Sequence, residues 1–227
     1  MAVRQAGEHP VPRPVDPQKQ GTAIMPDKQT DPDLSSLLFE PNVWINGPID
    51  QSALGFFLEK LAHVRRDGLP LLMELNTQGG DADIGRRIAS EIRYFLAEPG
   101  RTGRIIGKSY VYSAGVTILA AFPRTLRYLT EDAVLLIHER HLTQTLELKG
   151  PVQACLQIVR EQLSLLETSK ALELEGFREF VEGSDISVEN LLEHARNNCY
   201  LRAPQIEKHG LVNRVIRPGD LGGQAAT

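Results

Sequence analysis

Ser113 and His138 are the two residues of this sequence whose types and positions suit acyl transfer. Ser113 follows a β-rich run over residues 107–112 and precedes small residues that suit the start of a helix. His138 follows an apolar run over residues 133–137. A serine at a strand-to-helix turn and a histidine at a strand end commonly serve as nucleophile and general base. The pair predicts a hydrolase, although each residue alone is more often a helix cap or a core histidine.

A Gly-Gly pair upstream supplies a further group that acyl transfer needs. The tetrahedral intermediate carries a negative oxygen, which preorganised hydrogen-bond donors stabilise. Gly79 and Gly80 follow a predicted strand, and a loop without side chains lets a backbone amide point into a site. We therefore expect the N–H groups of Gly80 and Ala114 to form an oxyanion hole, although a Gly-Gly pair is also common as a plain turn. His141 is the alternative base, but it lies beyond the predicted strand end.

Alternating strands and helices are expected to position these groups, which indicates an α/β fold. Apolar or β-rich runs predict strands over residues 43–45, 69–76, 104–111, 125–129, 133–138 and 211–216. Apolar residues at helical spacing predict helices over residues 49–66, 150–175, 187–196 and 204–209, and further helices after the loop at 77–81 and after Ser113. Asp81 and Asp83 are both candidates for the cap of the helix after that loop.

The helix over residues 150–175 carries a stripe of apolar residues that includes Leu156, Val159 and Leu163. Such a stripe is stable only when it is buried against a partner. Another subunit and another part of the same chain are both open as that partner.

The composition excludes several classes of function. The 227 residues carry a net charge of -4, which leaves no basic stripe for phosphates, so we expect no nucleic-acid partner. No apolar run reaches the length of a membrane span. Cys155 and Cys199 lie far apart without metal-ligand spacing, which favours free thiols in a reducing cytoplasm. We expect no metal and no other cofactor.

Three parts of the chain are expected from composition. Residues 1–35 are rich in Pro, Gln, Asp and Lys and cannot bury enough apolar surface to offset their ordering entropy, so they are expected to be a mobile N-terminal segment. Residues 36–217 are expected to form one catalytic domain, and residues 218–227 a disordered tail.

Short motifs across residues 37–216 resemble the proteolytic subunit of the ATP-dependent Clp protease, a serine peptidase family with a crotonase-like fold. Several motifs in the right order are much more specific than any one of them. The motifs are Gly47-Pro48-Ile49-Asp50, Leu75-Asn76-Thr77-Gln78-Gly79-Gly80, Tyr112-Ser113-Ala114-Gly115, Leu136-Ile137-His138-Glu139 and His209-Gly210-Leu211-Val212.

The resemblance implies a crotonase-like spiral of β-β-α units from which the long helix projects. It implies Ser113 as nucleophile, His138 as general base, and Gly80 with Ala114 as oxyanion donors. The family's third catalytic residue, usually an aspartate, falls on Asn198, or on Asn197 if the register slips by one. An asparagine can hold the histidine tautomer but supplies no full charge, so reduced activity is expected.

The sequence departs from the family pattern at two further places. Gln78 replaces a proline before the Gly-Gly pair, and residues 108–112 are bulkier than the family's small residues. Tyr110 and Tyr112 either narrow the pocket or pack into the core, and alternation along the strand favours the core for one of them.

By resemblance, the protein is a cytoplasmic serine endopeptidase subunit that degrades unfolded proteins in protein quality control. The resemblance also implies two stacked heptameric rings, built by this chain alone or with a paralogue. A separate AAA+ unfoldase would deliver substrates, since this chain has no P-loop.

The alternative is a non-catalytic or weakly active ring subunit, which Asn198 keeps open. A crotonase-type acyl-CoA enzyme would not need the Ser113 and His138 pair, and Lys108 is poorly placed for a serine-lysine dyad.

Overall fold

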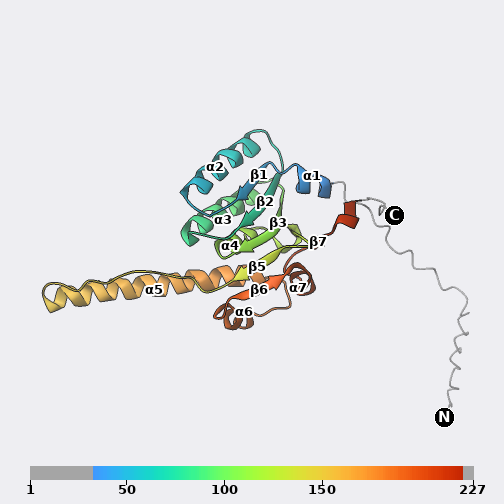
Figure 1. Ribbon diagram of the computed structural model, residues 1–227. Coiled ribbons are helices and arrows are strands. Elements are labelled where there is room, and N and C mark those ends of the chain that lie inside the picture. The colour runs from blue at the N-terminus through green and yellow to red at the C-terminus, as the bar shows by residue number, and fades with distance from the viewer. Residues whose placement is uncertain (1–32, 222–227) are drawn as a thin grey trace, which may run out of the picture. The chain divides into compact units, whose positions relative to one another are not determined.

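The computed structural model describes residues 33–221, which form one sheet with helices on both of its faces (Figure 1). The sheet has seven strands in the order β1-β2-β3-β4-β7, with β5 paired to β3 and β6 paired to β5. All pairs are parallel except β5 with β6. The predicted α/β class is therefore confirmed. The strands are β1 (Val43–Asn46), β2 (Leu71–Thr77), β3 (Gly103–Tyr112), β4 (Arg127–Thr130), β5 (Val134–Ile137), β6 (Cys199–Arg202) and β7 (Arg214–Ile216).

The helices lie between these strands along the chain, except that β5 follows β4 directly and α6 follows α5 directly. Two of them begin at the aspartates that follow strand ends: Asp50 caps α2, and Asp81 rather than Asp83 caps α3 by accepting bonds from two backbone amides. The helices are α1 (Asp33–Phe39), α2 (Gln51–Arg66), α3 (Ala82–Ala97), α4 (Ala114–Ala120), α5 (Val152–Val181), α6 (Val188–Ala195) and α7 (Ala203–Lys208), with short 3-10 turns η1 (Arg124–Leu126) and η2 (Pro218–Leu221).

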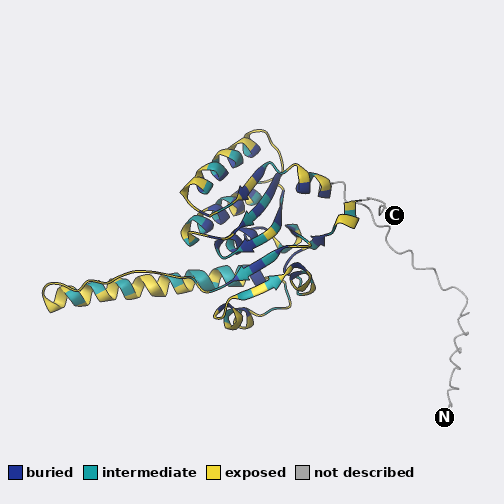
Figure 2. Cartoon of the chain, in the orientation of Figure 1, coloured by how far each residue is buried: buried dark blue, intermediate teal, exposed yellow. Residues whose placement is uncertain are grey.

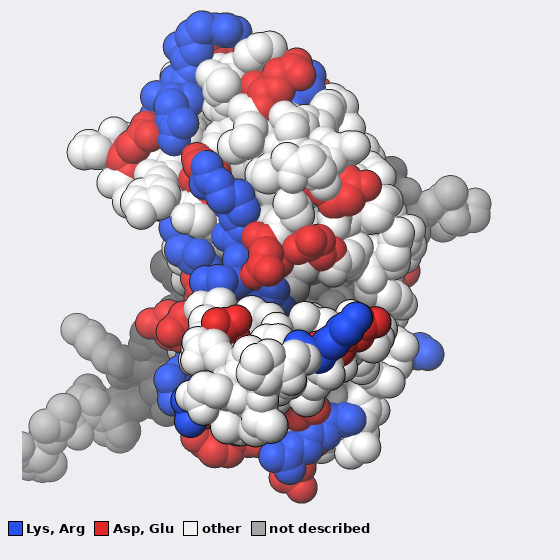
Figure 3. All heavy atoms as spheres, turned by 90° about the vertical axis from the view of Figure 1, so that its left-hand side faces the viewer, with Lys and Arg blue, Asp and Glu red and all other residues white. Residues whose placement is uncertain are grey.

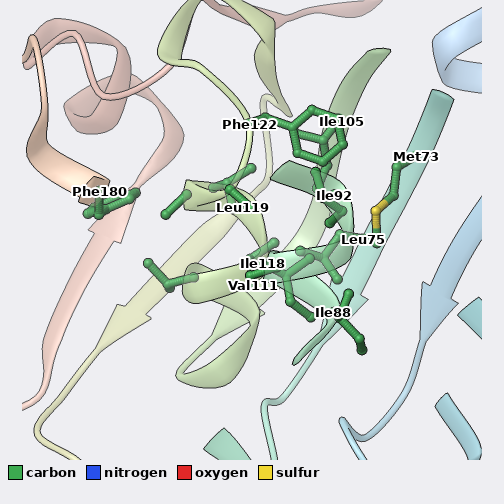
Figure 4. Packing of buried hydrophobic residues seen from close by; sticks show 14 of the residues in the cluster. Met73, Leu75, Ile88, Ile92, Ile105, Val111, Ile118, Leu119, Phe122 and Phe180 are labelled. Carbon is green, nitrogen blue, oxygen red and sulfur yellow. The ribbon is translucent and has the colours of Figure 1, made fainter. Parts of the chain in front are cut away.

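Strand β2 is buried on both faces, which explains its nearly continuous apolar sequence. Leu71, Met73 and Leu75 point into the main core, which α2, α3 and α4 cover. Leu72 points to the other face, where it packs with Leu37 of α1 and other apolar residues. Figure 4 shows the main core, in which side chains from α3 and α4 pack against β2 and β3.

Strand β3 bends near its middle and changes its neighbour there. Its first half pairs with β4, from Ile105 to Gly107, and its second half pairs with β5, from Tyr110 to Tyr112. Ser109 lies between the two halves with a positive φ of 51°, a conformation that interrupts a regular strand. This bend lets one ten-residue strand carry the sheet from its main part to the β5 and β6 layer.

Helix α5 extends away from the sheet, and the residues that it buries lie at its C-terminal end (Figure 2). Phe180 and Val181 are its buried residues, whereas Leu156 and Leu163 keep 45% and 53% of their surfaces exposed. No part of residues 33–221 therefore buries this apolar stripe fully. No helix in that range is long and apolar enough to cross a membrane.

Several boundaries differ from the sequence prediction. Helix α1 begins at Asp33, so residues 33–35 are helical although they were assigned to the mobile segment. The rest of that segment, residues 1–32, lies outside the described residues, as do residues 222–227 of the tail. Strand β6 was not predicted, because its half-exposed residues give a weak apolar signal. Strand β7 begins only at Arg214, and α5 continues to Val181.

Candidate active site

Ser113 and His138 lie side by side because their strands are parallel neighbours. Tyr112 of β3 pairs with Leu136 of β5, so Ser113 stands beside Ile137 and one residue from His138. The Ser113 amide donates to the Leu136 carbonyl over 2.8 Å, which holds the serine at this edge. The carboxyl ends of parallel strands are where α/β sheets usually carry their sites.

Ser113 has an unusual backbone conformation for a residue with a side chain. Its φ is 53° and its ψ is -116°, outside the regions that non-glycine residues normally occupy. Such strain costs about 1–3 kcal/mol and persists where the surroundings impose it. Ser113 occupies the N-cap position of α4, yet its side chain makes no capping bond. The hydroxyl is therefore not committed to the helix.

The two glycines after β2 are required by close backbone packing. A Cβ atom at Gly79 would lie 2.8 Å from the Cβ of Ser113, and one at Gly80 would lie 2.3 Å from the carbonyl oxygen of Ile49. Both glycines also have positive φ, 91° and 151°. Ile49 donates to the Gly79 carbonyl and accepts from the Asp81 amide, so a short bridge fixes the loop against the end of β1.

The amides of Gly80 and Ala114 are free to bind an acceptor. Ala114 is the first residue of α4, and an amide in the first helical turn has no partner inside the helix. Among residues 33–221 neither amide donates a hydrogen bond. Both residues line the same cavity as Ser113. The arrangement can therefore present two N–H donors to a negative oxygen beside the serine.

His138 is held in one tautomer by a neighbouring carbonyl. Its Nδ1 lies 2.6 Å from the carbonyl oxygen of Glu139. A carbonyl oxygen only accepts hydrogen bonds, so Nδ1 carries the proton and Nε2 is left as an acceptor. The ring of His141 lies 4.9 Å from that of His138, but His141 is exposed while His138 is half-buried. No hydrogen bond joins Ser113 to His138 within the described part of the chain.

A cavity of about 700 Å³ lies in front of these groups, between α3, α4 and α5. Its wall carries both signs of charge. The Arg140 guanidinium lies 2.6 Å from Asp83 of α3, and Arg93 of α3 forms a paired contact with Glu179 of α5. The Arg140 amide donates to Glu173 of α5. On the face shown in Figure 3, acidic and basic side chains are likewise interspersed.

Asn198 lies beside His138 along the backbone, but its side chain does not reach the ring. Ile137 pairs with Cys199 across the antiparallel strands β5 and β6, so Asn198 stands opposite His138. Its φ of 58° is one that asparagine tolerates, and its side chain is exposed. Neither Asn198 nor Asn197 lines the cavity, and no bond joins Asn198 to His138 among residues 33–221.

The cavity wall does not include Lys108, Tyr110 or Tyr112, which the sequence also singled out. Lys108 binds Glu74 over 2.6 Å and the carbonyl of Leu38, which commits its ammonium to the α1 side of the sheet. Tyr110 and Tyr112 are both half-buried, and their rings lie on one face with centroids 5.5 Å apart and planes tilted by 45°. The expectation that one of them enters the core was wrong, because residues two apart on a strand share a face.

The site residues Arg140 and Glu173 were not found from the sequence. They are 33 positions apart in the sequence and meet only in the folded chain. Neither residue belongs to a motif or to a recognisable spacing pattern. Within residues 33–221 no group of three or more His, Cys, Asp or Glu residues is arranged to hold a metal ion.

A family model described as Clp protease matches residues 27–219. The chain belongs to the Clp protease family. It is 25% identical over 177 residues to the ATP-dependent Clp protease proteolytic subunit 2 of Pseudomonas aeruginosa, covering 77% of this chain and 80% of that protein. It is also 25% identical over 187 residues to the ATP-dependent Clp protease proteolytic subunit of Paracoccus denitrificans, covering 82% and 86%.

A solved structure of a ClpP1 mutant from Listeria monocytogenes has the same fold. It superposes with a TM-score of 0.59 at 21% identity and covers 83% of this chain and 99% of that one. The predicted crotonase-like fold is thereby confirmed. Membership of this family supports a ClpP-type peptidase.

Proposed function

We propose that this protein is a serine endopeptidase subunit that hydrolyses unfolded proteins through an acyl-enzyme on Ser113. The single observation that carries the proposal is the convergence of four groups on one cavity: the uncommitted hydroxyl of Ser113, the Nε2 acceptor of His138, and the free amides of Gly80 and Ala114. These are the parts that nucleophilic acyl transfer requires.

In the proposed mechanism, His138 Nε2 takes the proton of the Ser113 hydroxyl while Oγ attacks the peptide carbonyl carbon. The amides of Gly80 and Ala114 donate to the developing oxyanion, and each such donor is worth about 3–4 kcal/mol. The protonated imidazole then gives its proton to the leaving amine nitrogen, and the C–N bond breaks. Water, deprotonated by His138, hydrolyses the ester and restores the Ser113 hydroxyl.

Asn198 enters this proposal through its family position and its place opposite His138. Its amide oxygen would hold the histidine tautomer after a rotation of the exposed side chain. In the single chain, the carbonyl of Glu139 already holds that tautomer. The proposed chemistry therefore does not depend on Asn198 in order to begin.

The same proposal includes partners for the chain. The relatives are named as subunits of ATP-dependent proteases, which supports a separate AAA+ unfoldase that delivers unfolded substrates. The exposed apolar stripe of α5 supports assembly with further subunits, proposed as two stacked heptameric rings with or without a paralogue. A cytoplasmic location belongs to the same proposal.

Reaction of Ser113 with a fluorophosphonate probe tests the proposal. The probe phosphonylates only an activated serine, so intact mass should rise by one adduct on the wild type and not on Ser113→Ala. His138→Ala should slow labelling by about 10²-fold or more, since a general base contributes at least that much. The absence of an adduct on an assembled wild type would instead support the non-catalytic ring subunit, which the comparisons do not favour.

A further inference from the structure

One peptide group connects His138 to a carboxylate on α5. The carbonyl of the Glu139–Arg140 peptide accepts a bond from His138 Nδ1 at 2.6 Å. The N–H of that same peptide donates to Oε2 of Glu173. The imidazole, the peptide and the carboxylate therefore form one continuous chain of hydrogen bonds.

The two bonds strengthen each other because a peptide group is conjugated. Its carbonyl and its N–H point in opposite directions in one plane, so a single group serves both partners. An N–H that donates to an anion passes electron density to its own carbonyl oxygen, and hydrogen bonds in such chains polarise one another. The Glu139 carbonyl is thus a better acceptor for Nδ1–H while Glu173 is ionised.

We propose that Glu173 is a positioning residue that orients His138 and stabilises its protonated form through the Glu139–Arg140 peptide. This proposal rests on the function proposed above for Ser113 and His138. Glu173 would supply the negative charge that an aspartate in place of Asn198 would otherwise provide. It acts from a different element, α5, and does not touch the imidazole.

The other carboxylates around the cavity have cationic partners or no contact with this peptide. Asp83 pairs with Arg140 at 2.6 Å, Glu179 pairs with Arg93, and the Glu139 side chain faces Arg196 at 3.6 Å. The charged or titratable residues that line the cavity with His138 are the α3 cap Asp81, Asp83, Arg86 and Arg93 of α3, Arg140 and His141 of the segment after β5, and Glu173, Glu175 and Glu179 of α5.

The geometry of the link is held from two sides. Arg140 binds α5 through its amide and α3 through its guanidinium, so the peptide before it is clamped between both helices. Glu173 is half-buried, where charges are screened less than at the surface. The two contacts of Arg140 fix the orientation of the carbonyl toward His138, and the weaker screening strengthens the effect of the Glu173 charge.

The substitution Glu173→Gln tests the link, because it keeps an acceptor for the Arg140 amide and removes the charge. We expect fluorophosphonate labelling of Ser113 to slow about tenfold, a part of what a general base contributes. The pH midpoint of the labelling rate should move down by about half a unit, since an anion that favours the protonated imidazole is lost. Glu173→Asp, which keeps the charge, should recover part of both effects.

Glu167→Gln is the matched control, as it removes one carboxylate from the exposed part of α5, outside the cavity. It should change neither the rate nor the midpoint. If Glu173→Gln leaves both unchanged, or slows acylation without moving the midpoint, Glu173 has no role through the peptide and the proposal is overturned.

A wild type that does not react with the probe would contradict the proposed function. In that case a second measurement tests the role of Glu173 separately. The imidazole signals of His138, assigned by their loss in His138→Ala, can be titrated by NMR in wild type and in Glu173→Gln. A lower midpoint in the variant supports the link even without activity. Equal midpoints contradict it.

Discussion

At the scale of single residues, backbone conformation decides which side chains are available for chemistry. Ser113 stands where a capping serine is expected, but its φ of 53° directs it away from the helix amides. The glycine loop packs directly against it, and only residues without a Cβ atom fit there. His138 is oriented by a carbonyl one residue away, which makes its tautomer a local property of the chain.

The role of Asn198 can be tested at this scale with Asn198→Asp. Aspartate tolerates the left-handed backbone nearly as well as asparagine, so the fold should be unchanged. Because the Glu139 carbonyl already occupies Nδ1 of His138, we expect the rate of Ser113 acylation to change less than about twofold. Fluorophosphonate labelling rates at several pH values give the answer.

Asn198→Ala is the companion variant and should leave acylation equally unaffected. It should lower the free energy of unfolding by about 1 kcal/mol, since alanine is strained at positive φ. An increase of tenfold or more in Asn198→Asp would show that this side chain turns onto His138 and acts as the third catalytic residue.

At the scale of elements, one buried arginine connects the ends of the helices around the site by hydrogen bonds. Arg127 of β4 is 2% exposed and donates to five backbone carbonyls from three segments. These carbonyls lie at the end of α4, at the end of α5 and before β7. Burial lowers the pKa of Arg127 to about 10, an effect that Glu179 and Glu182 oppose, so the guanidinium stays charged at neutral pH. The C-terminal carbonyls of two helices offset the cost of burying it.

The substitution Arg127→Met should lower the free energy of unfolding by about 2–4 kcal/mol, because several buried carbonyls lose their hydrogen-bond donors. Arg127→Lys should cost less, since an ammonium still serves up to three of them. Folded and unfolded states both keep Arg127 protonated below about pH 9, so the loss should be equal at pH 6 and pH 8. Urea unfolding at both pH values measures it, and a loss below about 1 kcal/mol would contradict the assigned role.

At the scale of the whole molecule, α5 carries both a site residue and a surface without a partner. Glu173 lies near its C-terminal end, where the helix is packed on the core. Toward its N-terminal end, apolar side chains such as Leu156, Leu163 and Leu166 stay about half exposed. Leu146 and Leu148 of the preceding segment are exposed as well. A stripe of this length is typical of a surface that other subunits cover.

We expect the double variant Leu156→Asp, Leu163→Asp to sediment as a smaller species than the wild type. Both side chains face solvent in the single chain, so the subunit itself should stay folded by circular dichroism. Gln157→Asp with Thr168→Asp introduces the same residue on the polar side of α5 and should leave the sedimentation coefficient unchanged. If both double variants sediment like the wild type, the stripe is not an assembly surface.

The sequence by itself determined most of the elements that form. Apolar periodicity identified β1 to β5 and the long helix, because these signals are local and strong. Ser113 and His138 were recognisable since each directly follows such a strand. Strand β6 and helix α1 were missed, as short elements with few buried residues carry little periodic signal.

Only the tertiary structure decided what surrounds these two residues. The register of β5 against β6 sets Asn198 opposite His138 but leaves its side chain outside, and the packing of α5 brings Glu173 to the Arg140 amide. Strand register and helix packing depend on contacts between residues far apart in the chain. A pattern of residue types along the sequence does not include such long-range contacts. The neighbours of His138 therefore could not be predicted from the sequence.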